Sequence, residues 1–290
     1  MLSSPDLYAF VRGEIVPLTS AYLHVSDLAI QRGYGIFDYF RVHETQPLFV
    51  EDHLDRFYES ARLMQLAVPL TRAALHDVIL ELARRNNLAL SGIKLLLTGG
   101  YSPDGYTPTP GEASLVLIQQ PLTMVEQAAI DCGIRIMSHE YVREVARAKT
   151  INYTMGIRLI QRLQETGLDD VLYHQQGVVS EFPRSNFFIV RQDNQDNIVV
   201  TPAQNVLFGI TRKKVLQLAS SRYQAEEGTV TLTDIWQAKE AFLTNTTKRL
   251  LPVVALDGKP IGTGQPGEVT LKLLAAFQEL EQAELHAVRM

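Results

Sequence analysis

Three short segments carry side chains that could act together on an aldehyde cofactor. Lys149 lies in Arg-Ala-Lys-Thr-Ile-Asn-Tyr, Glu181 lies in Val-Ser-Glu-Phe-Pro-Arg-Ser-Asn, and Gly209 and Thr211 lie in Leu-Phe-Gly-Ile-Thr-Arg. A lysine amine can add to an aldehyde, a carboxylate can keep a pyridine nitrogen protonated, and a Gly-Ile-Thr helix start can bind phosphate. A lone lysine is usually a solvated surface residue, so the order and spacing carry the argument. Together the segments predict a pyridoxal phosphate site.

These motifs resemble those of the fold-type IV (class IV) pyridoxal phosphate enzymes, the family of branched-chain and D-amino acid transaminases. In that family a lysine followed shortly by Asn-Tyr forms the internal aldimine and later shuttles a proton between Cα and C4′. The resemblance assigns this catalytic role to Lys149, and a hydrogen bond to the 3′-oxygen of the cofactor to Tyr153. It extends from about Ser26 to Gly258. It implies an α+β fold with two domains, an N-terminal α/β sandwich and a C-terminal pseudo-barrel with helices.

The remaining cofactor contacts are carried over motif by motif. Glu181 and Asn186 are separated by four residues, as in bacterial D-amino acid transaminases, although Phe-Pro-Arg replaces the small residues found there. Arg56, in His-Leu-Asp-Arg-Phe, matches the phosphate-binding arginine of the family, and Thr246 resembles a further phosphate contact. The expected cofactor-binding residues of pyridoxal 5′-phosphate are Arg56, Lys149, Tyr153, Glu181, Leu207, Gly209, Ile210, Thr211 and Thr246.

The substrate-binding motifs look most like a non-bacillar subgroup of D-amino acid transaminases. Branched-chain transaminases carry Phe-Glu-Gly where this chain has Phe37-Asp-Tyr. The bacillar D-amino acid enzymes hold the substrate carboxylate with an arginine and a histidine, and the matching positions here are Asp104 and Tyr106. Other cations must therefore bind the carboxylate. The candidates are Arg32, Lys94 and Arg184.

Arg32 is the principal candidate for the substrate carboxylate. It precedes Gly33-Tyr-Gly35, and the two glycines predict a tight loop placed close to another surface. A guanidinium can donate two parallel hydrogen bonds to a carboxylate. The resemblance implies a homodimer with shared active-site elements, and apolar residues in 22–39 could supply its interface. We therefore expect Arg32 to reach the active site of the neighbouring subunit.

The predicted reaction moves an amino group from an amino acid, with a D-amino acid favoured, to a 2-oxo acid. An L-branched-chain amino acid transaminase is the nearest alternative, and aminodeoxychorismate lyase is the next. A non-catalytic pyridoxal phosphate-binding protein would keep Arg56 and Thr211 but lose Lys149 or Glu181, and this chain has both. The handedness of the substrate depends on which way the side-chain and carboxylate pockets face above the cofactor ring.

The composition excludes several other classes of protein. A net charge of −5 argues against a nucleic-acid binder, and 46% hydrophobic with 20% charged residues is typical of a globular protein. The single cysteine excludes an internal disulfide, and the seven histidines show no metal-binding spacing, so no metal site is expected. Neither a secretory signal nor an apolar run of membrane-spanning length is visible. These features predict a cytoplasmic protein without a membrane partner.

The apolar periodicity predicts two domains, at 1–119 and 124–290. Strand patterns alternate with helical patterns in both, and Gly167 and the Asp-Gly pair at 257–258 are stop or turn signals. Gly33-Tyr-Gly-Ile-Phe-Asp38 lacks the third glycine of a dinucleotide-binding loop and no clear strand leads into it. The main expected elements are a hairpin over 7–17, helices over 52–66, 71–87, 155–165, 210–221 and 268–286, and strands over 93–98, 113–118, 133–137, 171–173, 178–181, 187–191, 241–244 and 252–256.

Overall fold

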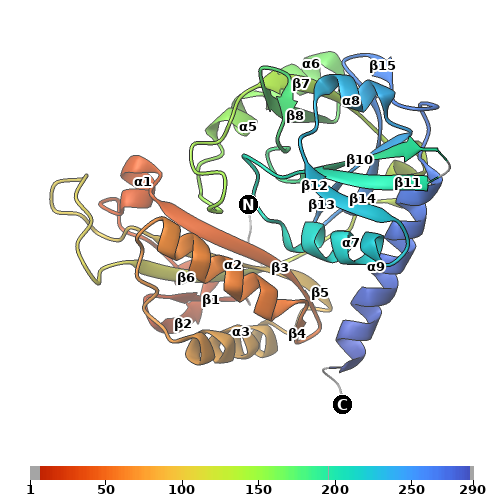
Figure 1. The fold of residues 1–290 in the computed structure, drawn as a ribbon. Helices are drawn as coiled ribbons and strands as arrows, with labels where there is room; N and C mark the ends of the chain where they lie inside the picture. The colour runs from red at the N-terminus through yellow and green to blue at the C-terminus, as the bar shows by residue number, and fades with distance from the viewer. Residues whose placement is uncertain (1–6, 195, 288–290) are drawn as a thin grey trace. The chain divides into compact units, whose positions relative to one another are not determined.

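The computed structural model describes residues 7–194 and 196–287 of the chain. It divides into two compact units (Figure 1). Unit 1 contains Met1–Thr123, Ala148–Asn152 and Ala283–Met290, and unit 2 contains Met124–Arg147 and Tyr153–Gln282. The segment Ala148–Asn152 thus packs with unit 1 although the chain on both sides of it belongs to unit 2. The domains predicted at 1–119 and 124–290 include residues 1–6, 195 and 288–290, which lie outside the described residues, and their independent folding stays a prediction.

Unit 1 is built on an antiparallel sheet. Within the described residues this sheet has six strands in the order β2-β1-β6-β5-β3-β4. The predicted hairpin is present, since residues 8–11 pair antiparallel with residues 14–17. Its two turn residues, Arg12 and Gly13, both have positive φ, as a type I′ hairpin turn requires. The strands are β1 (Tyr8–Val11), β2 (Glu14–Pro17), β3 (Gly35–His43), β4 (Gln46–Pro47), β5 (Leu90–Thr98) and β6 (Ser114–Pro121).

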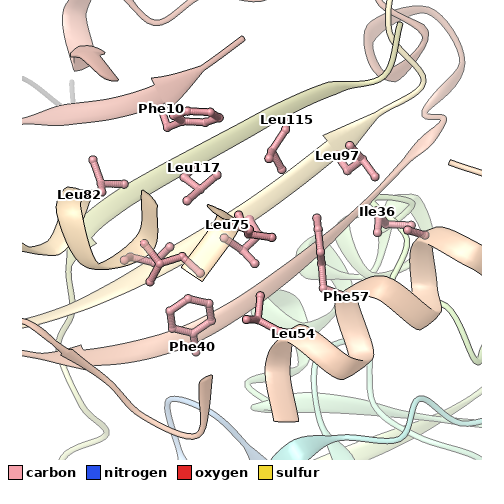
Figure 2. Packing of buried hydrophobic residues seen from close by; sticks show 14 of the residues in the cluster. Phe10, Ile36, Phe40, Leu54, Phe57, Leu75, Leu82, Leu97, Leu115 and Leu117 are labelled. Atoms are coloured by element: carbon pink, nitrogen blue, oxygen red, sulfur yellow. The ribbon is translucent and has the colours of Figure 1, made fainter. Parts of the chain in front are cut away.

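Two helices pack against the sheet and contribute to the apolar core of unit 1 (Figure 2). Helix α2 (Val50–Leu63) and helix α3 (Arg72–Asn86) bury residues at helical spacing, including Leu54 and Phe57 on α2. These side chains meet Phe40 and its neighbours from the sheet. The prediction of a helix over 71–87 agrees within one residue at each end. Helix α2 ends three residues earlier than predicted, since Met64 caps it and Gln65 takes a positive φ.

Strand β3 differs from the sequence-based expectation. Helix α1 (Leu28–Arg32) ends at Gly33, which has φ of 65° and caps the helix, and the strand begins two residues later. The Gly33-Tyr-Gly35 segment is therefore a helix cap followed by the start of a strand, rather than a free-standing tight loop. Residues of β3 alternate between two faces, so Ile36 and Phe40 enter the core while Phe37 and Tyr39 lie on the opposite face.

Unit 2 contains a mixed sheet. Within residues 124–194 and 196–282 its strands follow the order β12-β11-β10-β13-β14-β7-β8-β9, and β15 pairs with β14. The pairs β7–β8, β7–β14 and β11–β12 are parallel and the others are antiparallel. The strands are β7 (Ile134–Glu140), β8 (Asp170–Gln175), β9 (Val178–Val179), β10 (Asn186–Asp193), β11 (Asp196–Pro202), β12 (Gln224–Gly228), β13 (Glu240–Asn245), β14 (Arg249–Leu256) and β15 (Lys259–Pro260).

The helices of unit 2 follow most of the predicted pattern. The helix expected over 155–165 is split at Leu159 into two short helices, and Gly167 ends the second in a left-handed conformation, as predicted. Of the described helices, none combines the length and apolarity that a membrane crossing requires. The helices are α4 (Gln127–Cys132), α5 (Thr154–Arg158), α6 (Ile160–Thr166), α7 (Ile210–Ser220), α8 (Leu232–Gln237) and α9 (Glu268–Ala287).

Candidate active site

The backbone of Lys149 is fixed by two elements of unit 1. The N–H of Phe37 donates to the Lys149 carbonyl at 2.9 Å, and the N–H of Ile151 donates to the Gly35 carbonyl at 3.1 Å, so the segment runs antiparallel beside the start of β3. The Lys149 N–H donates to the buried Ser60 hydroxyl of α2 at 3.1 Å. Strand pairing and a helix side chain therefore determine where the Lys149 side chain starts.

The amine of Lys149 lies over an aromatic ring. Its Nζ is 4.6 Å from the ring centroid of Phe37, and the Nζ of Lys94 lies 5.6 Å from the same centroid. A cation over the face of an aromatic ring is attracted to its negative π surface. Lys149 is half-buried and Lys94 is exposed. Two lysines that the sequence marked for different roles, one catalytic and one substrate-binding, are thus brought to one ring.

Arg56 is held by a buried carboxylate. Its Nε and Nη2 donate to the two oxygens of Asp38 at 2.8 and 2.7 Å. Burial alone would raise the pKa of Asp38, but the positive charge of Arg56 and the hydrogen bonds hold that pKa well below its usual value. Among the described residues, Nη1 of Arg56 has no hydrogen-bond partner. An anion could accept from this remaining edge of the guanidinium.

Glu181 is the central carboxylate of unit 2, and its side chain is 3% exposed. One oxygen accepts from Nη1 of Arg143 at 3.0 Å. The other accepts from the Leu207 N–H at 2.9 Å and from the Asn186 amide at 3.2 Å. A buried charge is costly unless it is paired and hydrogen-bonded, and these donors compensate for its burial. Arg143 was absent from the predicted site, although a glutamate that follows an apolar strand is itself a signal to search for a cationic partner.

The start of helix α7 forms a narrow turn beside Glu181. Gly209 is the N-cap residue, and Ile210 and Thr211 form the buried first turn. A Cβ on Gly209 would lie 2.2 Å from the Asn186 Oδ1, so any larger residue there would have to displace the Asn186 amide. The first N–H groups of a helix lack intrahelical acceptors and carry partial positive charge. This turn, with Leu207 before it, therefore has the shape and the donors of a phosphate cradle.

The predicted contact at Thr246 lies in the turn after strand β13. The Asn245 Oδ1 accepts from the N–H groups of Thr247 and Lys248 at 3.0 and 2.6 Å, and this holds the turn. Thr246 is half-buried. Thr244, at the end of the same strand, has a hydroxyl that is fully buried with no hydrogen-bond partner among the described residues. Thr244 is therefore a second candidate for a ligand contact, beside Thr246.

The other predicted residues of unit 2 occupy less enclosed positions. Tyr153 is the N-cap residue of α5, and its ring centroid lies 5.7 Å from the guanidinium carbon of Arg143. Arg143 thus contacts Tyr153 as well as Glu181. Arg184 follows Pro183 and is exposed. The geometry of unit 2 brings Tyr153, Glu181 and Arg143 into one cluster, with Arg184 at the surface.

Arg32, in unit 1, lies beside the loop formed by Ser102–Thr107. It is exposed at the end of α1, and its Nη1 donates to the Gln31 carbonyl at 2.8 Å. The position of a Cβ on Gly105 would be 3.9 Å from the Arg32 Nη2 and 2.3 Å from the Gln31 Oε1. This loop holds the positions where the bacillar enzymes are expected to carry their carboxylate-binding arginine and histidine. The structure therefore puts a guanidinium next to a loop whose own sequence lacks one at those positions.

The carboxylate of Asp104 is used within that loop. It accepts from the N–H groups of Tyr106 and Thr107 at 2.9 and 2.7 Å, and from the hydroxyls of Ser102 and Thr107 at 2.9 and 2.7 Å. The hydrogen bonds from Thr107 and Tyr106 hold the pKa of Asp104 well below its usual value. Asp104 therefore organises the loop and leaves Tyr106 strongly exposed.

Comparison with known proteins identifies the class. Residues 35–256 match the model of the amino-transferase class IV family. The chain is 30% identical over 280 residues to a putative branched-chain-amino-acid aminotransferase of Methanocaldococcus jannaschii, covering 93% of this chain and 95% of that protein. It is 27% identical over 271 residues to a D-alanine aminotransferase of Bacillus licheniformis, with 92% and 94% covered.

A solved structure agrees with this result. The T.th. branched-chain amino acid aminotransferase complexed with N-(5′-phosphopyridoxyl)-L-glutamate superposes with a TM-score of 0.87 at 26% identity, covering 96% of this chain and 95% of that one. The chain therefore belongs to the amino-transferase class IV family and is an aminotransferase. The predicted fold-type IV architecture is confirmed, whereas the preferred amino acid and the roles of individual residues stay predictions.

Proposed function

We propose that this aminotransferase transfers the amino group of a D-amino acid to a 2-oxo acid through pyridoxal 5′-phosphate bound covalently at Lys149. Class IV aminotransferases use this cofactor. The described residues fit it: a guanidinium edge on Arg56, a glycine-restricted helix start at Gly209, and an orphaned buried hydroxyl on Thr244 suit a phosphate. The buried, hydrogen-bonded carboxylate of Glu181 suits a protonated pyridine nitrogen.

In this proposal each residue holds an atom or moves a proton. When bound, pyridoxal phosphate draws electrons away from the amino acid Cα. Glu181 would hold a proton on the pyridine nitrogen, and Arg143 and Asn186 donate hydrogen bonds to Glu181 that hold its carboxylate in place. The Lys149 amine would carry the Cα proton, and the backbone of Lys149 is anchored by strand pairing and by the Ser60 hydroxyl.

Phosphate and ring contacts complete the binding role. The first N–H groups of α7 and the Thr211 hydroxyl can donate to phosphate oxygens at the positive end of the helix. Thr246 and Leu207 would extend this cradle, and Tyr153 would donate a hydrogen bond to the 3′-oxygen of the cofactor.

The resemblance of the substrate-binding motifs to non-bacillar D-amino acid transaminases supports a D-amino acid substrate, and the position of Arg32 supports a carboxylate contact unlike that of the bacillar enzymes. Arg32 lies beside the Ser102–Thr107 loop. In that loop the position of the bacillar arginine is taken by Asp104, a carboxylate that accepts four hydrogen bonds within the loop. A guanidinium at this place supports the binding of an α-carboxylate by a residue other than those of the bacillar enzymes. Lys94 and Arg184 are the reserve candidates, both exposed.

The test is a half-reaction with separate D- and L-amino acids, followed through the absorbance of the bound cofactor as it is converted to its amine form. We expect conversion by D-amino acids and a fall of ~30-fold or more in kcat/KM for Arg32→Ala, since losing a desolvated charge pair costs roughly 2–5 kcal/mol. The kcat/KM of Arg32→Ala for simple amines, which have no carboxylate, should fall far less. Gln31→Ala is the matched control, because Gln31 contacts the same loop without a charge.

An L-branched-chain amino acid substrate is the second candidate. The relative with 30% identity and the superposed solved structure are both named as branched-chain aminotransferases. The same half-reaction separates the two candidates. Conversion by L-leucine, L-isoleucine or L-valine, with none by their D-forms, would establish the second and refute the first.

We also propose that the protein acts as a homodimer. Four large apolar side chains are strongly exposed on neighbouring segments of unit 1: Tyr22, Val25, Ile30 and Tyr106. The bridge between Asp27 and Tyr101 joins these segments. Exposed apolar surface of this kind marks interaction sites. Light scattering should give about twice the chain mass of 32.5 kDa, and a fully active monomer would contradict the proposal.

A further inference from the structure

Three charged or titratable side chains form a buried cluster between strand β3 and helix α2. Asp38 is fully buried and His53 is 3% exposed, and His53 Nδ1 lies 2.7 Å from the Asp38 Oδ1. Arg56 completes the cluster with its two hydrogen bonds to Asp38. His53 and Arg56 are three residues apart on α2, so the helix presents both to the same carboxylate.

The hydrogen bonds around Asp38 leave its carboxylate saturated. Oδ1 accepts from His53, from Nη2 of Arg56 and from the N–H of Tyr39, and Oδ2 accepts from Nε of Arg56. Burial lowers the pKa of His53, with Asp38 opposing and Arg56 adding to this shift. A neutral imidazole that donates from Nδ1 fits this environment, because Arg56 already balances the charge of Asp38.

Charge alone does not explain why an anion site would contain this cluster. A carboxylate beside a phosphate-binding guanidinium reduces the net positive charge that a phosphate would meet. What Asp38 provides is geometry: two parallel hydrogen bonds fix the plane of the guanidinium, and His53 fixes the carboxylate. The edge of Arg56 that carries Nη1 then keeps one orientation rather than sampling many rotamers.

We infer that Asp38 and His53 are positioning residues that aim Nη1 of Arg56 at the cofactor phosphate, so that together they set the preference for a phosphorylated cofactor. This inference rests on the proposed function, in which Arg56 binds that phosphate. For Asp38→Asn it predicts a change in phosphate binding opposite to the change that simple electrostatics predicts. Asp38→Asn makes the cluster more positive, which by charge alone would tighten phosphate binding, whereas loss of positioning weakens it.

The experiment measures selectivity rather than activity. Enzyme stripped of cofactor is titrated with pyridoxal 5′-phosphate and, separately, with pyridoxal, which lacks the phosphate, and the bound aldehyde is followed by absorbance. The dissociation constant of pyridoxal divided by that of pyridoxal 5′-phosphate is the selectivity ratio, and it reports on the phosphate alone. A change that merely loosens the fold weakens both ligands and leaves this ratio unchanged.

Arg56→Ala should reduce the ratio most. Asp38→Asn and His53→Leu should each reduce it by ~10-fold or more, the scale on which residues that orient metal ligands act. His53→Asn should keep most of the selectivity, since its amide can place an N–H where Nδ1 was. Glu281→Gln is the control, because Glu281 is also a buried carboxylate paired with an arginine, but it belongs to unit 2, where it accepts from Arg249. Its ratio should equal that of the unmodified protein.

Each outcome has a distinct meaning. Unchanged or higher ratios for Asp38→Asn and His53→Leu, with a reduced ratio for Arg56→Ala, would overturn the positioning roles and leave the phosphate contact intact. An unchanged ratio for Arg56→Ala would overturn the phosphate contact itself and the inference with it. If unmodified protein binds neither aldehyde, the proposed function fails. Should Asp38→Asn not fold, the contrast between His53→Leu and His53→Asn decides.

Discussion

The two clusters of the candidate active site anchor their central residues in opposite ways. Lys149 of unit 1 is held through its backbone, by strand pairing with β3 and by the hydroxyl of Ser60. Glu181 of unit 2 is held through its carboxylate, by Arg143, Asn186 and the N–H of Leu207. A group that carries a proton between atoms needs a mobile end on a fixed base. A group that stabilises charge must not move at all.

The largest expected effect breaks the lysine cluster. Lys149→Ala removes the amine that we propose binds the cofactor covalently and moves the proton. Activity should fall by ~10³-fold or more, and absorbance near ~400–430 nm should disappear. Steady-state rates and a spectrum of the purified variant test this. Lys94→Ala, which removes the other amine over the Phe37 ring, should keep the absorption band. Retention of both band and rate in Lys149→Ala would show that another residue is the nucleophile.

The carboxylate cluster should fail in a different manner. Glu181→Gln keeps the size of the side chain but removes the negative charge, so the rate should fall by ~10²-fold while the cofactor stays bound. Glu240→Gln is a matched control, because Glu240 is also buried in unit 2 but accepts from the first turn of α9. That change should lower stability and leave the chemical rate nearly unaltered. Near-normal turnover of Glu181→Gln would make the carboxylate structural.

Gly209 links the phosphate cradle to the carboxylate cluster. A Cβ there would displace Asn186, which donates to Glu181. Overpacking costs about 1–3 kcal/mol, so Gly209→Ala should weaken cofactor binding by ~10-fold, at about 1.4 kcal/mol per decade. Gly228→Ala serves as the control, since a Cβ at Gly228 would meet nothing within 4 Å. Equal cofactor affinities for the two variants, measured by equilibrium titration, would contradict this role for Gly209.

The smallest expected effect concerns pH and the cluster around Arg56. The pKa of His53 is lowered from 6.5 by burial, so the unfolded chain takes up a proton first as the pH falls. Stability that is present above pH 6.5 is then lost below it. The lowered pKa of Asp38 acts only below its ordinary value of 3.8, outside this window.

Between roughly pH 7.5 and 5.5 the free energy of unfolding of the unmodified protein should fall by up to about 1.4 kcal/mol more than that of His53→Asn. Urea unfolding of both proteins at the two pH values, with cofactor concentration fixed, measures this difference. Parallel losses in the two proteins would mean that His53 is charged in the folded state or does not differ from the unfolded chain.

Regular elements with one apolar face were predictable. The helices α2 and α3 repeat apolar residues at helical spacing, and the hairpin at Arg12-Gly13 has its own turn signal. Strand β3 was not predicted, because Phe37 and Tyr39 on its outer face are as apolar as Ile36 and Phe40 in the core. Alternation between polar and apolar residues, the usual sign of a strand, is absent there.

The sequence by itself determined the class of chemistry and its main residue types. Lys149, Glu181 and the turn at Gly209 stand in short motifs whose order is specific, and the family match agrees with the class that they indicated. Such motifs are readable because a helix start or a strand end is encoded by neighbouring residues.

Only the tertiary structure decided which residues the charged side chains of the candidate site contact. Arg143 meets Glu181 across 38 residues, Asp38 meets Arg56 across 18, and Arg32 comes to lie beside the Ser102–Thr107 loop. It also decided that Ala148–Asn152 packs beside β3 in unit 1. Charge and residue type show that a buried ion needs a partner, but only the packing of distant segments selects which of the 27 lysines and arginines it will be.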